Sequence, residues 1–258
     1  MMVLEKPKTP EEGELAEKRA ALALLETELV ERELELSTLQ QQLVSFEVEY
    51  LRVVGTRYAE LDEVTARIKE AHAAQQPADV TVQDEARAAR ETATASAAEM
   101  GRQDHVKEIV SFEPSESLKS LYRSLALKVH PDIAATDEQR QLGHEWFIKV
   151  QEAYKEQDKS ALQALAVEWD TSPDSVEGEG VGSDLVRVIR QIASVKRRLE
   201  TLSQAIDTLK TNELCGLMAK REAAREAGRN LLEEMAAKLE SEVADARQVL
   251  ADLQDQVT

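Results

Sequence analysis

Two long stretches of the chain repeat apolar residues in alternating steps of three and four, which is the pattern of helices that pair along a seam. The first stretch lies within residues 11–72 and the second within residues 184–258. The seam positions of the first are Leu22, Leu25, Leu29, Leu36, Leu39, Leu43, Phe46, Tyr50 and Val53. Those of the second are Val188, Ile192, Val195, Leu199, Leu202, Ile206 and Leu209, continued from Leu232 to Leu253. The chain is therefore predicted to be all-α, with long coiled-coil helices towards both ends.

Three features interrupt the first seam. Arg32 occupies a seam position, where a polar side chain can fix the register of a helix pair. The heptad phase then slips between residues 53 and 58, as it does at a stutter. Gly55 lies within this slip. Because glycine inside a helix costs about 1 kcal/mol relative to alanine, we expect a neighbouring helix to approach closely at this position.

Charge and composition restrict the function of the chain. Its 258 residues contain 32 Lys and Arg against 50 Asp and Glu, which gives a net charge of −18. Nucleic acids and anionic membranes are usually bound by basic surfaces, so neither is an expected partner. No apolar run reaches the length of a membrane span. The single cysteine, Cys215, cannot form an intramolecular disulfide, and this favours a reducing cytoplasm.

The middle of the chain lacks the heptad repeat and divides into three segments. Residues 73–104 are rich in Ala, Gln, Glu and Thr and contain Pro77, which predicts a flexible or weakly helical linker. Residues 171–183 contain turn-forming residues and predict a second linker. Between them, residues 105–170 predict a small helical domain. The helix-capping residues predicted in this domain are Ser115, Thr136 (in a capping box with Gln139) and Asp158.

A His-Pro-Asp tripeptide, formed by His130, Pro131 and Asp132, lies between the first two predicted helices of this domain. Pro131 cannot continue a helix, and it disfavours helical backbone angles at the residue before it. We therefore expect an exposed loop whose charged side chains are available to a partner. The cations on the helix that precedes this loop are Lys119, Arg123 and Lys128.

The segment around this loop resembles the J-domain of DnaJ-type co-chaperones over residues 113–158. The residues in register with the second helix of that family are Lys119, Tyr122, Arg123, Leu125, Ala126 and Lys128. Those in register with its third helix are Phe147, Val150, Glu152, Ala153 and Tyr154. The chain departs from the family after the tripeptide, where Ile133 and Ala134 replace the frequent Arg-Asn. It also lacks the usual sequence of the first helix, which is either truncated or replaced by neighbouring coiled coil.

The resemblance implies a co-chaperone that binds a DnaK-type chaperone and stimulates its ATP hydrolysis, while the coiled coils bind a client or a scaffold protein. The residues that it assigns to partner binding are His130, Pro131, Asp132, Lys119, Tyr122, Arg123 and Lys128. No nucleophile motif, phosphate-binding loop or metal-ligand spacing accompanies the tripeptide, so we expect no enzymatic activity, cofactor or metal. The alternative is a coiled-coil scaffold with a J-like insert that lacks chaperone activity.

The sequence is compatible with two ways of pairing the coiled-coil helices. If the two coiled-coil regions pair within one chain, the domain between them joins the end of the first to the start of the second. They would then run antiparallel and form a stalk with the J-like domain at one tip. Self-association into a homo-oligomer satisfies the same seams, and the sequence leaves both arrangements open.

Overall fold

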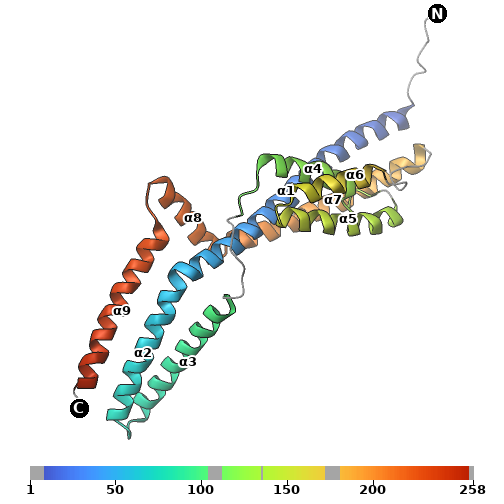
Figure 1. Ribbon diagram of the computed structural model, residues 1–258. Helices are drawn as coiled ribbons and strands as arrows, with labels where there is room; N and C mark the ends of the chain where they lie inside the picture. The colour runs from blue at the N-terminus through green and yellow to red at the C-terminus, as the bar shows by residue number, and fades with distance from the viewer. Residues whose placement is uncertain (1–8, 104–111, 135, 172–180, 256–258) are drawn as a thin grey trace, which may run out of the picture. The chain divides into compact units, whose positions relative to one another are not determined.

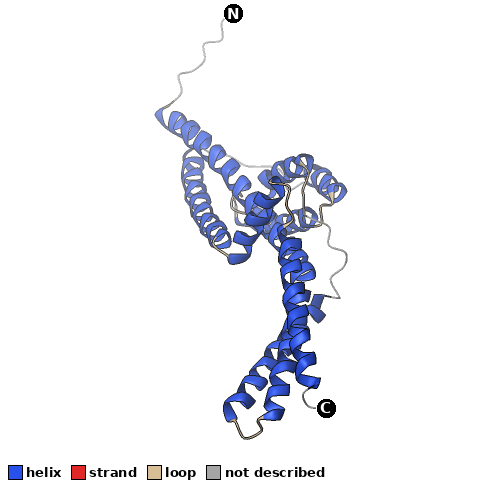
Figure 2. Cartoon of the chain, turned by 90° about the vertical axis from the view of Figure 1, so that its left-hand side faces the viewer, coloured by secondary structure: helices blue, strands red, loops and turns tan. Residues whose placement is uncertain are grey.

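The computed structural model describes residues 9–103, 112–134, 136–171 and 181–255. Within these ranges the chain forms helices joined by turns and loops, and no residue is in a β-strand (Figure 2). The α-helices are α1 (Pro10–Tyr50), α2 (Thr56–Gln75), α3 (Val80–Gln103), α4 (Glu116–Val129), α5 (Asp137–Lys155), α6 (Lys159–Thr171), α7 (Val181–Lys210), α8 (Glu213–Glu226) and α9 (Leu231–Asp255), and a π-helical turn, η1 (Leu51–Gly55), separates α1 from α2 (Figure 1). The predicted all-α class is confirmed.

The chain divides into two compact units, each assembled from segments that are far apart in the sequence. The first unit contains residues 1–41 and 112–211, and the second contains residues 42–111 and 212–258. The division passes through α1, so the coiled-coil region predicted over residues 11–72 contributes to both units. The predicted domain boundaries therefore do not coincide with the units.

In the first unit, α1 and α7 pair along the predicted apolar seam. The buried residues that α1 and α7 contribute to one cluster are Leu15, Leu22, Leu29, Val188, Val195 and Leu202. On each helix these residues recur every seven positions, so each helix presents one continuous stripe to the other. The burial of this stripe is the main apolar contact between the two helices.

The two helices run parallel to each other. Arg19 binds Asp184 at 2.8 Å, and Glu33 binds Arg198 at 2.7 Å. Both pairs are separated by 165 residues in the sequence, so contacts advance in the same direction along both helices. The expected antiparallel stalk is therefore wrong for this pair. The prediction assumed that the intervening domain brings the end of the first coiled-coil region beside the start of the second, whereas α7 begins near the start of α1.

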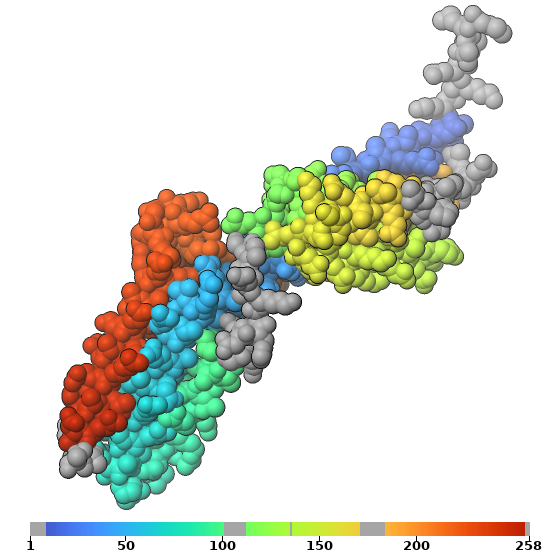
Figure 3. All heavy atoms as spheres, viewed as in Figure 1, coloured from blue at the N-terminus to red at the C-terminus, as the bar shows by residue number. Residues whose placement is uncertain are grey.

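The helices α4, α5 and α6 form a three-helix bundle that packs against α1. Its atoms form one continuous body in the space-filling view, in green to yellow (Figure 3). The largest buried residues of its core include Tyr122, Leu125, Phe147, Tyr154 and Leu162, and α1 adds Val30 and Leu34 to the same cluster. Thus α1 presents the seam to α7 with one stripe and completes the core of the bundle with another.

The predicted caps of the bundle are confirmed. The Ser115 hydroxyl accepts a hydrogen bond from the backbone N–H of Leu118, at 3.2 Å. Thr136 forms the expected capping box with Gln139. The Asp158 carboxylate accepts from the backbone N–H of Ala161, at 2.9 Å. These bonds satisfy backbone donors that have no partner within the helix.

The second unit contains a helical hairpin where a linker was predicted. Residues 80–103 form α3, which folds back on α2 after a turn that contains Pro77. Arg90 of α3 binds both Glu63 and Glu70 of α2, at 2.6 and 2.7 Å. The prediction for residues 73–104 allowed a weakly helical segment, but a linker is wrong for α3, because this helix packs against α2. The buried face of α3 consists of alanines, which form a less apolar pattern in the sequence than the leucines of a seam do.

The π-helical turn η1 lies at the slip in the heptad phase and within the second unit. A π-turn inserts an extra residue into a helix and so shifts the apolar face that follows. Gly55 is buried there, and a Cβ at this position would lie 3.1 Å from Cε of Met100 on α3. This atom is the end of a flexible side chain, and Cδ2 of Leu51 lies closer still, at 3.0 Å, so the expected close approach of a neighbouring helix stays a prediction. The α1 residue Phe46 and the η1 residue Val54 also share a buried cluster with Leu232 and Leu239 of α9.

Among the described helices, none has both the length and the apolar character needed to cross a bilayer.

The α1–α7 seam predicts contrasting effects for two leucines of α1. Leu29 is 0% exposed and Leu24 is 74% exposed. Leu29→Ala should lower the free energy of unfolding of the first unit by about 2 to 5 kcal/mol, because it leaves a cavity in the seam. Leu24→Ala should change it by less than about 0.5 kcal/mol. Urea denaturation followed by tryptophan fluorescence measures this unit alone, since both tryptophans, Trp146 and Trp169, lie in it. Equal losses in the two variants would contradict the seam.

Candidate partner-binding site

The His-Pro-Asp tripeptide lies in the turn between α4 and α5, as predicted. The backbone N–H of His130 donates to the carbonyl of Ala126 at 2.9 Å. The backbone of His130 is extended, with φ of −63° and ψ of 127°. Helix α4 therefore ends at Val129, directly before the histidine that precedes Pro131. The predicted exposure is wrong for His130, however, because the residue is only 3% exposed.

The imidazole of His130 is fixed by contacts on three sides. Its Nδ1 accepts a hydrogen bond from the backbone N–H of Asp132, at 3.1 Å. Its Nε2 lies 3.3 Å from Oε1 of Glu33 on α1. The ring also meets Phe147 edge to face, with the ring centroids 4.5 Å apart. Because Nδ1 is an acceptor, the proton of the neutral ring is on Nε2, which donates to Glu33.

Glu33 links this histidine to α7. The Glu33 residue is 2% exposed, and its Oε1 also accepts two hydrogen bonds from Arg198, at 2.9 Å from Nε and 2.7 Å from Nη2. Burial alone would raise the pKa of this carboxyl, but the hydrogen bond from His130 and the charge of Arg198 together lower it below its ordinary value. We call Glu33, His130 and Arg198 the Glu33 cluster. It joins α1, the loop and α7.

Further contacts anchor the loop to its surroundings. Ile133 packs against the α1–α7 seam, and its carbonyl accepts a hydrogen bond from Nε2 of Gln191, at 2.9 Å. On the other side, Gly143 of α5 lies so close to the end of α4 that an added Cβ would be 2.7 Å from the carbonyl oxygen of Val129. Only glycine fits there without a backbone shift. The loop is therefore held by α5 and α7 as well as by the Glu33 cluster.

The cations predicted to face a partner are all paired within the chain. Lys119 binds Glu116 at 2.8 Å. Arg123 lies 2.7 Å from Glu31 of α1, and Lys128 lies 2.6 Å from Asp170 of α6. All three pairs retain exposed side-chain surface, where an ion pair contributes at most about 1 kcal/mol. A partner carboxylate could therefore exchange for any of them at little cost.

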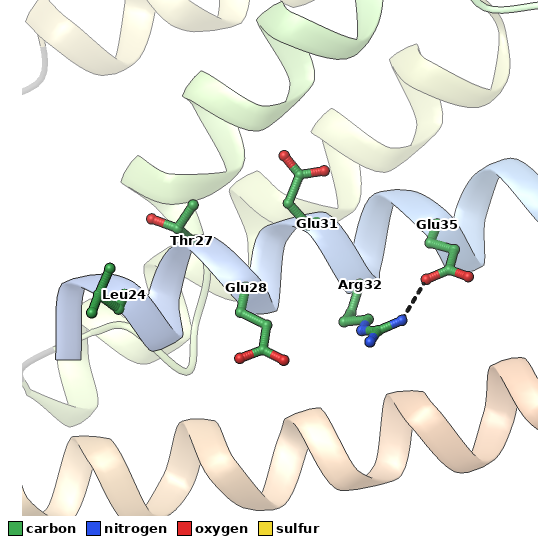
Figure 4. Close-up of a pocket in the computed structure, with 6 residues that line it drawn as sticks. All are labelled: Leu24, Thr27, Glu28, Glu31, Arg32 and Glu35. Atoms are coloured by element: carbon green, nitrogen blue, oxygen red, sulfur yellow. Dashed lines mark hydrogen bonds and ion pairs between the residues drawn. The ribbon is translucent and has the colours of Figure 1, made fainter. Parts of the chain in front are cut away.

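Two glutamates of α1 bind different neighbouring helices, Glu31 the helix α4 and Glu35 the helix α7. Figure 4 shows Glu31 pointing to the side of the three-helix bundle, and Arg32 pointing to the opposite side, where it binds Glu35 at 2.8 Å. Oε1 of Glu35 in turn accepts from Lys210 of α7, also at 2.8 Å, and this bond lowers the pKa of Glu35. Arg32 was predicted to fix the register of the seam; it contacts Glu35 of its own helix, which in turn binds α7, and its effect on register stays a prediction.

Tyr122 is part of the core and does not face a partner. It is fully buried, and its ring lies 4.8 Å from that of Tyr154, centroid to centroid. Burial also raises the pKa of its hydroxyl. The assignment of Tyr122 to partner binding is therefore not supported by its position, and its contribution is to the packing of α4 on α5.

Pro131 and Asp132 are the parts of the tripeptide that remain partly accessible. Asp132 lines an open groove of about 940 Å³ between the loop, the start of α5 and α7. Arg140, Arg190 and Arg197 line the same groove. The backbone N–H of Asp132 bonds to His130, and the residue as a whole is partly accessible.

Sequence reasoning missed Glu33, Arg198 and Gly143. Two signals were available in the sequence. Val30 and Leu34 form an apolar pair outside the predicted seam, which indicates a second buried face on α1. Gly143 interrupts the interior of a predicted helix, which often marks a close approach of another backbone. Nothing in the heptad pattern indicated that Glu33 and His130 would meet.

No model of a known protein family, no curated protein and no solved structure matches this chain. Within the described residues, no three His, Cys, Asp or Glu side chains are placed to hold a metal ion together. The site is therefore interpreted from its own residues.

The lowered pKa of Glu33 predicts how the stability of the first unit depends on pH. An ionised Glu33 stabilises the folded state fully above its unfolded pKa of about 4.3, and this contribution is lost as the pH falls through the lower folded value. The groups that face Glu33 are His130 from the loop and Arg198 from α7. Glu33→Gln should therefore lower the free energy of unfolding by about 1 to 3 kcal/mol at pH 7.

The difference between this variant and the wild type should shrink steadily as the pH falls below about 4. Urea denaturation followed by tryptophan fluorescence across this pH range measures it. Glu28→Gln, at an exposed position of the same helix, is the matched control and should behave as the wild type throughout. A loss at pH 7 that persists unchanged at pH 3 would show that the Glu33 carboxylate is not the stabilising group.

Proposed function

We propose that this chain is a J-domain-like co-chaperone of a DnaK-type chaperone, acting in the cytoplasm. The observation that carries the proposal is the tripeptide His130–Asp132, which joins two helices whose residues are in register with the second and third helices of the J-domain family. The cations of α4 lie on the surface before the loop. Val30 and Leu34 of α1 occupy the core beside α4 and α5, which supports replacement of the missing first helix by coiled coil.

In this function the chain would act by binding rather than by catalysis. The cations of α4 would steer the bundle to an acidic surface and form charge-assisted hydrogen bonds there. The loop would then bind one conformation of the chaperone better than another and so shift its equilibrium towards ATP hydrolysis. The outer surfaces of the coiled-coil helices would bind a client or a scaffold protein and bring it to the chaperone.

A second function is favoured by one specific observation, the burial of His130. A histidine that is 3% exposed and bonded to Glu33 stabilises the contact between α1 and the loop, whatever else it does. The bundle would then be a structural side element of a helical scaffold. The co-chaperone function requires that the loop become accessible for part of the time, whereas the scaffold function does not.

The two functions are distinguished by single-turnover ATP hydrolysis of a DnaK-type chaperone from the same organism. The wild-type protein should accelerate hydrolysis, and Asp132→Asn should return the rate to that of the chaperone alone. The Asp132 variant should keep the stability of the wild type, because only its backbone N–H bonds to His130. His144→Gln, at an exposed position of α5, is the matched control and should stimulate as the wild type does. Stimulation that survives in Asp132→Asn would show that this carboxylate does not carry the activity. No stimulation by the wild type at saturating concentration would favour the scaffold.

A further inference from the structure

In the Glu33 cluster, His130 is bound within the chain, although the proposed function requires it to contact a chaperone. A side chain that is 3% exposed cannot reach another molecule, so His130 can contact a chaperone only after the loop is uncovered. The same helix that covers His130 with Glu33 also binds Arg123 with Glu31. An acidic helix of the chain itself thus covers the histidine of the loop and pairs one of the three cations of α4.

We propose that Glu33 and Arg198 hold the chain in a self-inhibited state, in which α1 and α7 exclude the chaperone from the His-Pro-Asp loop. This inference rests on the proposed co-chaperone function and adds its regulation. Docking of the loop inside the chain and its binding to a chaperone are mutually exclusive. Docking of the loop therefore weakens binding of the chaperone. The apparent Kd equals the Kd of the open form divided by the fraction of molecules that are open.

The contacts indicate which element moves when the loop opens. Val30 and Leu34 of α1 belong to the apolar core of the bundle, so α1 cannot leave without exposing that core. Helix α7 contacts the loop through Arg198, through Gln191 and through the edge of the seam at Ile133. Displacement of α7 breaks these contacts and opens the α1–α7 seam, but it leaves the core of the bundle intact. It would also give water and a partner access to Glu33 and His130.

Arg198 is the residue at which this state can be tested without disturbing the core. Its side chain is 38% exposed, whereas that of Glu33 is 2% exposed. Arg198→Glu removes both hydrogen bonds to Glu33 and brings a second carboxylate beside a buried one, which favours the open state. Lys196→Glu, at an exposed position of the same helix, makes the same change in charge away from the cluster and is the matched control. Arg198→Ala is a milder second variant in case the charge reversal unfolds the first unit.

Two measurements on the full chain separate the inference from the proposed function. Amide hydrogen exchange of residues 130–134 reports the opening of the loop without any chaperone, through the N–H of Asp132 that donates to His130. Single-turnover ATP hydrolysis, titrated with the co-chaperone, reports its consequence. We expect faster exchange in Arg198→Glu and half-maximal stimulation at a concentration about tenfold lower than for the wild type. Lys196→Glu should match the wild type in both.

The outcomes are distinct. Faster exchange with unchanged stimulation would overturn self-inhibition while the co-chaperone function stands. Unchanged exchange in both Arg198 variants would overturn the inference that this residue holds the loop closed. Faster exchange with no stimulation by any form of the protein would overturn the co-chaperone function, and self-inhibition with it. Tryptophan fluorescence confirms that each variant is folded before it is compared.

Discussion

The first unit depends on a buried carboxylate that must be shared. Glu33 takes three hydrogen bonds through one oxygen, one from His130 and two from Arg198. An uncompensated buried charge is strongly destabilising, so the ionised carboxylate requires its partners to remain in place. Those partners come from a loop and a helix that are respectively 97 and 165 residues away in the sequence. One interaction therefore fixes the positions of three separate segments.

The position of Glu33 on α1 explains why it can have this role. Leu22 and Leu29 lie on the face that packs against α7, and Val30 and Leu34 lie on the face that enters the bundle. With 3.6 residues per turn, Glu33 falls between these two faces and points into the space where α1, the loop and α7 meet. A polar residue at such a junction satisfies groups that neither apolar face could satisfy. Two residues earlier, α1 presents Glu31 to Arg123 on the bundle side.

Much of the local structure followed from the sequence, whereas the long-range contacts did not. The seven-residue spacing of Leu22, Leu29, Val188 and Val195 predicted the seam, because periodicity depends only on neighbouring turns. The caps at Ser115 and Thr136 were predicted for the same reason. The parallel direction of α1 and α7 was not predicted, since a heptad seam is compatible with either direction. It is set by ion pairs between distant residues and by the path of the chain.

The candidate site shows the same division. The tripeptide and the helices around it were predicted from Pro131 and from the register of the flanking residues, but the exposure of His130 was not, because burial is decided by what packs against the loop. The covering residues Glu33 and Arg198 resemble ordinary charged residues of a coiled coil in the sequence. The helix α3 was missed because small residues such as Ala86 and Ala93 can line a buried face without forming a conspicuous apolar stripe.

The most direct test of this account is the state of the His130 ring in the intact protein, observed by nitrogen-15 NMR of labelled histidine near neutral pH. The structure predicts a single tautomer with the proton on Nε2, and slow exchange of that proton with water because it is bonded to buried Glu33. The exposed His144 serves as the internal reference for a ring in free exchange. A His130 ring that averages both tautomers and exchanges as fast as His144 would show that the loop is open, and would contradict the central place of the Glu33 cluster.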